Sequence, residues 1–528
     1  MIDRNFVNRF ISEHFILFMA IMCLFCDFFF KQSDRQDTMI KMCLVFVVCL
    51  IALICNLVFY MCSKGETHTY EVKDTKNKNK KIVKYIHDKD DIIKNIIFFG
   101  FVLRLIYVLF TSVVERQNDA GTFVPNEGGH LGYIFYLYDN GKLPDFNPLS
   151  FWQYYHPPLH HILAALWVKI NTVIGVNIDN AVENIQFLGL FYSICTMYVA
   201  DIIAKEASIK RKGRIYIVML LCFYPYLIMM SGVVNNDVLV TLLVLMTIMY
   251  MQRWFYNSNW NNIIKLALCL GLATMTKLSA LLLAPAMAFV FIYKLMKDRN
   301  ISIKDYLLQF AAFLGISVPI ATWFQFRNFI KFNIPLGYVP NLGDNSWQYL
   351  DMGAVRRLFD FSFSQFRIHY MIFDSSSKDC TYNIFIALLK YAAFNEQSSK
   401  LEGSVFGRVV AYTLLLTMAV LSIFLCIEFF KLIKKSITKV KDDSFAIDIF
   451  YLLNVACIMI SYVSFCLKYK HICSMNIRYV IIAVIIIIIM GCKKMDMKDE
   501  QDRISGISKK VTVLFCVLSM VSFGSMLF

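Results

Sequence analysis

The sequence predicts an all-α membrane protein that crosses the bilayer many times. Hydrophobic residues make up 58% of the 528 residues and charged residues only 17%, whereas a soluble domain is nearer half apolar and a quarter charged. Apolar runs long enough for a spanning helix recur along the whole chain. Lysines and arginines gather in alternate loops between these runs. Together these observations exclude a soluble enzyme, a disordered chain and a coiled coil.

The apolar runs number about thirteen, and most have the length that a membrane helix needs. They lie at roughly 14–31, 39–62, 95–114, 184–204, 214–234, 238–254, 262–277, 279–296, 304–324, 406–430, 445–466, 479–492 and 511–527. We therefore expect about thirteen transmembrane helices, two of which come before residue 95.

The positive charges orient these helices. The polar stretch 64–94 carries nine Lys and no Arg, and we place it in the cytoplasm as a solvated connector. Counting spans, the basic loops that follow fall on the same side, whereas the long segments 115–183 and 325–405 fall outside. Lys468, Lys470 and Arg478 also fall outside, against the rule. The net charge of +15 is explained by such loops, so nucleic-acid binding is not expected.

Two helices in the first outer loop, 115–183, are expected to lie in the membrane interface rather than cross it. Gly132 to Asn140 has apolar residues at helical spacing, and Gly141 follows as a C-terminal stop. Leu159 to Ile174 is apolar and starts after two prolines, which suit a first helical turn. If this second segment crossed the membrane, every later loop would change sides and the charge pattern would be lost.

The first outer loop also concentrates residues that carry chemistry. Four of the nine His of the chain, His130, His156, His160 and His161, lie in it. Ionisable residues at the face of a membrane protein are candidates for function. His156 and His160 are one helical turn apart, and we expect both to face a cavity. Two His without a carboxylate partner are a weak metal motif, so we expect no cofactor and keep a divalent metal as the alternative.

Several motifs of the chain resemble one enzyme family. The first outer loop has an acidic residue soon after a span, a Gly-Lys-Leu-Pro turn at 141–144 and Tyr-His-Pro-Pro-Leu-His-His at 155–161. It is similar to the first outer loop of GT-C glycosyltransferases, and most to bacterial members grouped with protein O-mannosyltransferases and the aminoarabinose transferase of lipid A. Later segments that match in order are 231–237, 271–279, 323–328 and 476–479.

The resemblance implies transfer of a monosaccharide from a polyprenyl-phosphate carrier to an acceptor on the outer face, with inversion at the anomeric carbon. Such a transfer needs one carboxylate as general base. Asp119 stands where the family places its catalytic acid. Glu127 is the rival, because residues 126–132 partly resemble the family's Asp-Glu-x-His-Phe-Gly run.

Further residues are expected to bind the donor or the acceptor. His130, Tyr155, His156 and His160 belong to the first outer loop, and Arg327 begins the second. Lys277, Arg478 and Tyr479 lie at outer ends of spans. An arginine fork suits a phosphodiester, whereas for Lys277 simple snorkelling to the headgroups is an equal alternative. We read Asp237 first as a helix cap.

These expectations divide the chain into four parts. Residues 1–94 hold two extra spans and the connector, and 95–324 form the catalytic core with the first outer loop. Residues 325–405 form a second outer loop that covers the cavity, and 406–528 hold the C-terminal spans. The partners expected are the lipid-linked sugar, an acceptor that is a protein, lipid or glycan, and the bilayer of a bacterial plasma membrane or an endoplasmic reticulum. A lipid transporter or flippase and an outer-face glycan ligase or polymerase are the alternative functions.

Overall fold

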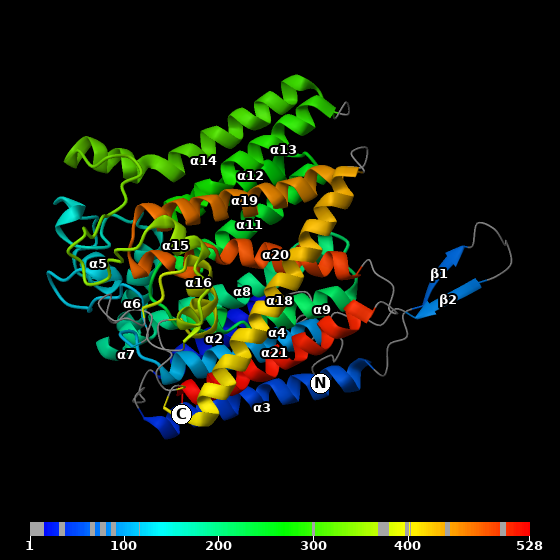
Figure 1. Ribbon diagram of the computed structural model, residues 1–528, viewed down its shortest axis with the longest axis horizontal. Coiled ribbons are helices and arrows are strands. Elements are labelled where there is room, and N and C mark those ends of the chain that lie inside the picture. The colour runs from blue at the N-terminus through cyan, green and yellow to red at the C-terminus, as the bar shows by residue number, and fades with distance from the viewer. Residues whose placement is uncertain are drawn as a thin grey trace.

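The computed structural model of the chain is a bundle of long helices whose axes run mostly along one direction (Figure 1). It describes residues 15–30, 37–63, 69–73, 81–85, 91–115, 117–297, 301–367, 380–395, 401, 403–438, 444–496 and 503–527. The predicted all-helical, multi-span class is confirmed, and the protein is an integral, multi-pass membrane protein. Seven of the described helices are long and apolar enough to cross a membrane.

Every predicted apolar run contains a helix of this bundle. The long helices are α2 (Phe15–Phe29), α3 (Thr38–Ser63), α4 (Asp91–Phe110), α8 (Ile185–Glu206), α9 (Arg211–Phe223), α11 (Asp237–Tyr256), α12 (Trp260–Thr276), α13 (Ala284–Lys297), α14 (Ile303–Phe332), α18 (Val405–Thr438), α19 (Ser444–Lys468), α20 (Ile481–Asp496) and α21 (Arg503–Leu527). A count of thirteen spans stays a prediction, because several of these helices are shorter than a bilayer is thick.

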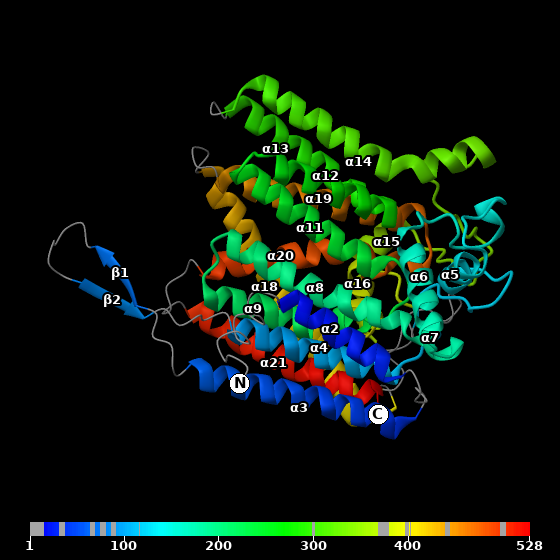
Figure 2. The same cartoon turned by 180° about the vertical axis from the view of Figure 1, so that it is seen from behind.

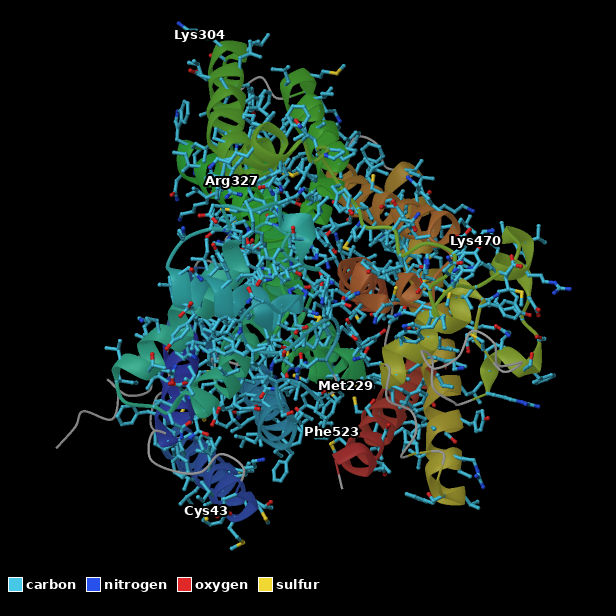
Figure 3. All side chains as sticks on the ribbon, turned by 90° about the vertical axis from the view of Figure 1, so that its left-hand side faces the viewer. Cys43, Met229, Lys304, Arg327, Lys470 and Phe523 are labelled. Carbon is cyan, nitrogen blue, oxygen red and sulfur yellow. The ribbon has the colours of Figure 1, made fainter. Side chains whose placement is uncertain are left out.

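The two predicted interface helices form within a few residues of their expected bounds. They are α5 (Gly129–Asn140) and α6 (Leu159–Val173), and a short helix that the sequence did not predict, α7 (Ile178–Glu183), follows them. All three lie at one end of the bundle, seen from two sides in Figures 1 and 2. Following the orientation that the charges predict, we call this end the outer end; Figure 3 shows it face on.

A small hairpin at the opposite end was not expected. The strands β1 (Thr69–Lys73) and β2 (Lys81–Tyr85) pair antiparallel, with Thr69 opposite Tyr85. Both segments are rich in β-branched and aromatic residues, which favour strands. The hairpin lies within the predicted connector, whose cytoplasmic location stays a prediction, and residues 64–68, 74–80 and 86–90 lie outside the described residues.

The predicted span 214–234 is broken into α9 and α10 (Pro225–Met230). Pro225 has no N–H to donate into the preceding turn, so carbonyls at the end of α9 lose helical partners. Arg104 of α4, which is fully buried, supplies them. Its guanidinium donates to the carbonyls of Leu221 and Cys222, each at 3.0 Å. A buried cation thus completes the hydrogen bonding of a helix break in the middle of the bundle.

The second outer loop is shorter and more structured than predicted. Helix α14 continues to Phe332, so the segment 325–332 is helical and the loop begins at Asn333, whose φ of 54° ends the helix. The loop contains α15 (Ala354–Phe359), the 3-10 turn η3 (Phe363–Phe366) and α16 (Ile384–Phe394), which packs against α10 and α18.

Two hydrogen bonds tie the second outer loop to the segment between α19 and α20. The N–H of Leu350 donates to the carbonyl of Lys470 at 2.8 Å, and the N–H of Ile472 donates to the carbonyl of Gln348 at 3.0 Å. The second segment contains the 3-10 turns η4 (Ile472–Met475) and η5 (Ile477–Tyr479). These two hydrogen bonds hold the second outer loop next to the segment that contains Arg478.

Candidate functional site

A cavity of about 520 Å³ opens at the outer end of the bundle. Its walls come from four parts of the chain that are far apart in sequence: the first outer loop, the starts of α11 and η2 (Leu278–Leu283), the second outer loop, and the segment from α19 to η5. Seven predicted site residues line it, namely Asp119, His130, Tyr155, His156, Lys277, Arg478 and Tyr479. The fold therefore brings together most of the residues that the sequence selected.

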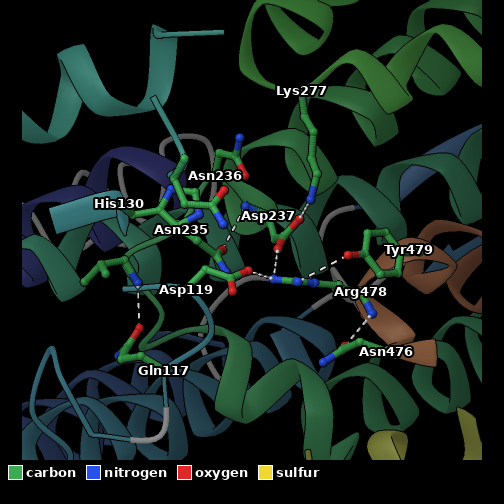
Figure 4. Close-up of polar contacts among 12 residues, drawn as sticks. Gln117, Asp119, His130, Asn235, Asn236, Asp237, Lys277, Asn476, Arg478 and Tyr479 are labelled. Atoms are coloured by element: carbon green, nitrogen blue, oxygen red, sulfur yellow. Dashed lines mark hydrogen bonds and ion pairs between the residues drawn. The ribbon is translucent and has the colours of Figure 1, made fainter. Parts of the chain in front are cut away.

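A network of four charges lies on the cavity wall (Figure 4). Arg478 Nη1 is 2.9 Å from Asp119 Oδ2 and 3.8 Å from Asp237 Oδ2, so one guanidinium bridges two carboxylates. The other oxygen of Asp237 pairs with Lys277 Nζ. Both cations also lie over the ring of Tyr479, at 5.1 Å for Arg478 and 5.5 Å for Lys277. Two positive and two negative side chains thus balance one another on this wall.

The loop that carries Asp119 is held against the start of α5. The carbonyls of Asp119 and Ala120 accept hydrogen bonds from the N–H groups of His130 and Leu131, at 3.0 and 2.7 Å. Asp119 itself has φ of 58°, a conformation that Asp adopts more readily than most residues. This close approach depends on Gly129, where a Cβ would lie 2.5 Å from the carbonyl oxygen of Ala120. The strained backbone points the carboxylate of Asp119 at Arg478.

Asn476, which precedes η5, holds the backbone of Arg478 in place. The N–H of Arg478 donates to Asn476 Oδ1 at 3.0 Å, so Asn476 caps the turn. Arg478 Nη2 donates to the hydroxyl of Tyr479 at 3.2 Å, and burial raises the pKa of that hydroxyl. Tyr479 is therefore a neutral group beside the guanidinium, and only the two carboxylates neutralise the charge of Arg478.

The histidines of the first outer loop form a stack that starts at the cavity. The ring of His130 lies nearly parallel to that of His156, with centroids 5.6 Å apart, and to that of His161, at 5.1 Å. His130 Nδ1 and His161 Nε2 share a hydrogen bond of 2.9 Å. Burial, with His161 next in effect, holds the pKa of His130 well below its usual value, and burial lowers the pKa of His156 to about 3. These side chains are neutral hydrogen-bonding groups at physiological pH.

His156 and His160 do not face the cavity together, so that prediction is wrong. Helix α6 begins only at Leu159, so the four-residue helical spacing does not extend back to His156. His156 lines the cavity, whereas His160 is buried and bonds the carbonyl of Val234 at 2.8 Å. His161 is buried and outside the cavity lining, and its hydrogen bond to His130 supports a ring of the cavity wall.

Glu127 and Arg327 also lie outside the cavity lining. The backbone carbonyl of Glu127 accepts a hydrogen bond from Tyr154 Oη at 3.2 Å, within the first outer loop. Arg327 lies on the extended end of α14, and its guanidinium donates to the carbonyl of Pro144. In this position Arg327 joins α14 to the Gly-Lys-Leu-Pro turn of the first outer loop.

Sequence reasoning underrated Asp237, which it read as a helix cap. The structure assigns the N-cap of α11 to Asn236 and makes Asp237 the first helical residue. Its side chain is 4% exposed, and its carboxylate contacts both cations of the network. The signal was present in the sequence, because Asp237 is the single acidic residue between Glu206 and Asp298, and an isolated acid among apolar spans marks function.

The arrangement suits binding of one anionic group. Lys277 and Arg478 both line the cavity, so a phosphate that enters between them would meet two cations, each of which also pairs with a carboxylate. The lining also includes apolar side chains, among them Leu281, Leu282, Ile458 and Phe465. In the described part of the chain, no group of three or more His, Cys, Asp or Glu side chains is placed to hold a metal ion; the role of a metal stays a prediction.

Comparisons with known proteins agree with the motifs. The sequence profile of the family described as dolichyl-phosphate-mannose-protein mannosyltransferase matches residues 155–323, about a third of the chain. This segment contains His156, Asp237 and Lys277 of the cavity wall. A search of curated protein sequences gives no significant match.

Two solved structures are similar over most of the chain. One is ArnT from Cupriavidus metallidurans bound to undecaprenyl phosphate, at 11% identity, covering 83% of this chain and 77% of that one, with a TM-score of 0.47. The other is the archaeal oligosaccharyltransferase AglB from Archaeoglobus fulgidus, in complex with an inhibitory peptide and a dolichol-phosphate. It has 10% identity and covers 83% of this chain and 56% of that one, with a TM-score of 0.46.

These TM-scores are too low to carry an argument about fold, so the assignment rests on the family profile together with the motifs. The predicted resemblance is confirmed: through residues 155–323 the chain has the sequence pattern of the dolichyl-phosphate-mannose-protein mannosyltransferases, a family of membrane glycosyltransferases.

Proposed function

We propose that this protein transfers a monosaccharide from a polyprenyl-phosphate carrier to an acceptor hydroxyl at the outer face of the membrane. The observation that carries the proposal is the charge network on one cavity wall, where Arg478 and Lys277 face the same space as the carboxylate of Asp119. A lipid-linked donor needs cations beside an apolar surface, and the cations and apolar side chains that line this cavity support the proposal.

In the proposed reaction, the phosphodiester of the donor binds to Lys277 and Arg478. The acceptor oxygen attacks the anomeric carbon from the side opposite the phosphate, which inverts that carbon. The bond between the anomeric carbon and the phosphate oxygen breaks, and its electron pair leaves with the lipid phosphate. Asp119 takes the proton of the acceptor hydroxyl. The cations stabilise the growing negative charge of the leaving phosphate.

Asp119 is a better base than Glu127 in this geometry, because it lines the cavity and Glu127 does not. Its carboxylate is 35% exposed, which leaves room for an acceptor to reach the oxygen that does not pair with Arg478. Asp237 is more buried and holds both cations, so we assign it the role of a positioning residue.

The test uses the full chain in lipid nanodiscs with synthetic polyprenyl-phosphate sugars and an acceptor extract. We expect wild type to consume donor. We expect Asp119→Asn, which keeps the shape of the side chain, to lower the rate by about 10²–10⁴-fold, the usual contribution of a general base. Glu127→Gln is the matched control and should consume donor at nearly the wild-type rate.

Each outcome bears on a different part of the proposal. Equal rates for wild type and Asp119→Asn would leave the transfer reaction standing and remove Asp119 as its base. If folded wild type consumes no donor of any sugar while acceptor is present, the transferase assignment fails and a lipid transporter or flippase becomes the better account. Release of a long glycan instead of one sugar would favour an outer-face ligase or polymerase.

A further inference from the structure

The part of the second outer loop that runs from α15 to η3 exposes large apolar side chains while it buries two polar ones. Arg357 and Gln365 are buried, at 0% and 2% exposure, whereas Arg356 and Ser362 are exposed. Its apolar side chains are open: Val355 is 73% exposed, Phe359 70% and Phe363 95%. A segment that faces water shows the opposite arrangement, because burying apolar surface is the main gain in folding.

Hydrogen bonds explain why the polar residues point inward. Arg357 donates to the carbonyl of Cys466 near the end of α19. Gln365 Oε1 accepts from the N–H of Tyr382 at 2.9 Å and from the N–H of Asn383 at 3.2 Å, just before α16. The segment is therefore fastened to the bundle through its polar side, and this leaves its apolar side turned outward.

The exposed apolar residues share one face. Val355 and Phe359 are four residues apart on α15, so they lie on the same side of that helix. After the helix, Phe361 and Phe363 continue the run of exposed apolar side chains, at 56% and 95% exposure. We call Val355, Phe359, Phe361 and Phe363 the apolar face of the second outer loop.

This face lies at the level where the bundle leaves the membrane. The bond from Arg357 reaches Cys466, two residues before α19 ends at Lys468. In Figure 1, α15 lies closer to the long helices than α5 does. Helix α19 is one of the described helices that are long and apolar enough to cross the membrane.

We propose that the apolar face of the second outer loop inserts into the outer leaflet of the bilayer. The large apolar side chains that this face exposes favour an apolar medium outside the protein. The segment is bonded to the outer end of α19, which is long and apolar enough to span the membrane, so the face lies at the level of the outer leaflet. Aromatic side chains are also the residues that membrane proteins place at this depth. The occupant is therefore lipid, rather than a partner protein above the membrane.

This insertion gives the bilayer a part in shaping the cavity. The same loop supplies Tyr338 and Leu342 to the cavity wall, and the ring of Tyr338 packs edge-on against Tyr155 at 5.7 Å. A loop fastened to α16 and α19 on one side and to lipid on the other holds these residues in place. The inference does not depend on the reaction that the cavity performs.

The experiment places a photoreactive residue, p-benzoyl-phenylalanine, at single positions of the full chain in proteoliposomes. The test position is Phe363. Ile423, in the middle of α18 and 61% exposed, is the control for lipid contact, and Asn140, exposed at the end of α5, is the control for contact with water. After illumination, mass spectrometry identifies what each position has captured.

We expect Phe363 to give phospholipid adducts at a yield close to that of Ile423 and several-fold above that of Asn140. A yield at the level of Asn140, in a preparation where Ile423 captures lipid, would overturn the proposal. Capture of another protein chain, including a second copy of this one, would overturn it as well and assign the face to a protein interface. The Ile423 control shows that the protein is folded and inserted, so each result decides.

Discussion

At the scale of single residues, the cavity is built on charges that depend on one another. Asp237 neutralises Lys277 and also contacts Arg478, and Arg478 in turn reaches Asp119. Buried charges are tolerated only when they are paired, because desolvation of a lone ion costs several kcal/mol. The four charges therefore depend on one another, and removing one of them leaves its partner as an unpaired charge whose desolvation is no longer compensated.

The first residue-scale prediction concerns Asp237 and Lys277. We expect Asp237→Asn to destabilise the protein by roughly 3–5 kcal/mol, the usual cost of removing one partner of a buried ion pair. The double variant Asp237→Asn/Lys277→Met should recover much of that loss, because no unpaired ammonium is left. Thermal unfolding in detergent measures both. A double variant less stable than Asp237→Asn alone would contradict this account of the pair.

At the scale of elements, the function of the first outer loop rests on the close contact between its two halves. The chain at 119–120 and the start of α5 are joined by two backbone hydrogen bonds, and Gly129 has φ of 88° at that point. A side chain there would meet backbone atoms, which are unable to move aside as a flexible side chain does. The position of Asp119 thus depends on a glycine in another element.

The element-scale prediction is a comparison of two glycine substitutions. We expect Gly129→Ala to destabilise the protein by more than about 2 kcal/mol, because it adds a steric clash to the cost of a positive φ. Gly315→Ala in α14 is the matched control, since a Cβ there meets nothing within 4 Å. That change should be neutral or stabilising by up to about 1 kcal/mol, as alanine favours helix. Equal effects at the two positions would show that the close contact at Gly129 contributes nothing to the free energy of unfolding.

Differences between the predicted and observed elements have simple physical reasons. The predicted span 214–234 is broken because Pro225 interrupts its hydrogen bonds, and sequence reading had not weighed this residue. Helix α14 runs past its apolar stretch because helical hydrogen bonds continue into water wherever the end of the helix is packed. Arg327 therefore stands on a helix and contacts Pro144, far from its expected place in a loop.

At the scale of the whole molecule, the buried histidines link stability to pH. Burial is the largest cause that lowers the pKa of all four, His130, His156, His160 and His161. In the unfolded chain they would titrate near 6.5. Below that pH the unfolded state binds protons that the folded state does not bind, so the free energy of unfolding falls as pH falls. The loss continues until the folded pKa is reached, at about 4 for His160 and about 3 for His156.

We therefore expect the melting temperature to drop steadily as pH is lowered from 6.5 to 4.5. Each neutral histidine contributes about 1.4 kcal/mol per pH unit in this range. His161→Phe keeps a ring against Tyr133. It should make the drop shallower, because one proton fewer is taken up on unfolding. Differential scanning fluorimetry over this pH range measures both slopes. A melting temperature that is constant over the range, or an unchanged slope in His161→Phe, would contradict the linkage.

The sequence by itself determined the class of molecule and most of the residues of the site. Apolar runs of membrane length fix the helices, because a backbone in lipid must satisfy its hydrogen bonds internally. Seven of the ten site residues selected by motif line one cavity. Each of the seven lies at an outer end of a span or in the first outer loop, so the predicted topology places them at one end of the bundle, and their roles stay predictions.

The tertiary structure alone decided which charges meet and which histidines face the cavity. Asp237, Lys277 and Arg478 come from three helix ends that are 40 to 241 residues apart in sequence, and no local pattern pairs them. His160 and His161 are neighbours, yet one contacts Val234 and the other His130, because the start of α6 sets their directions. Sequence specifies elements through local energies, whereas contacts between elements depend on how distant surfaces fit, and a single sequence does not reveal that fit.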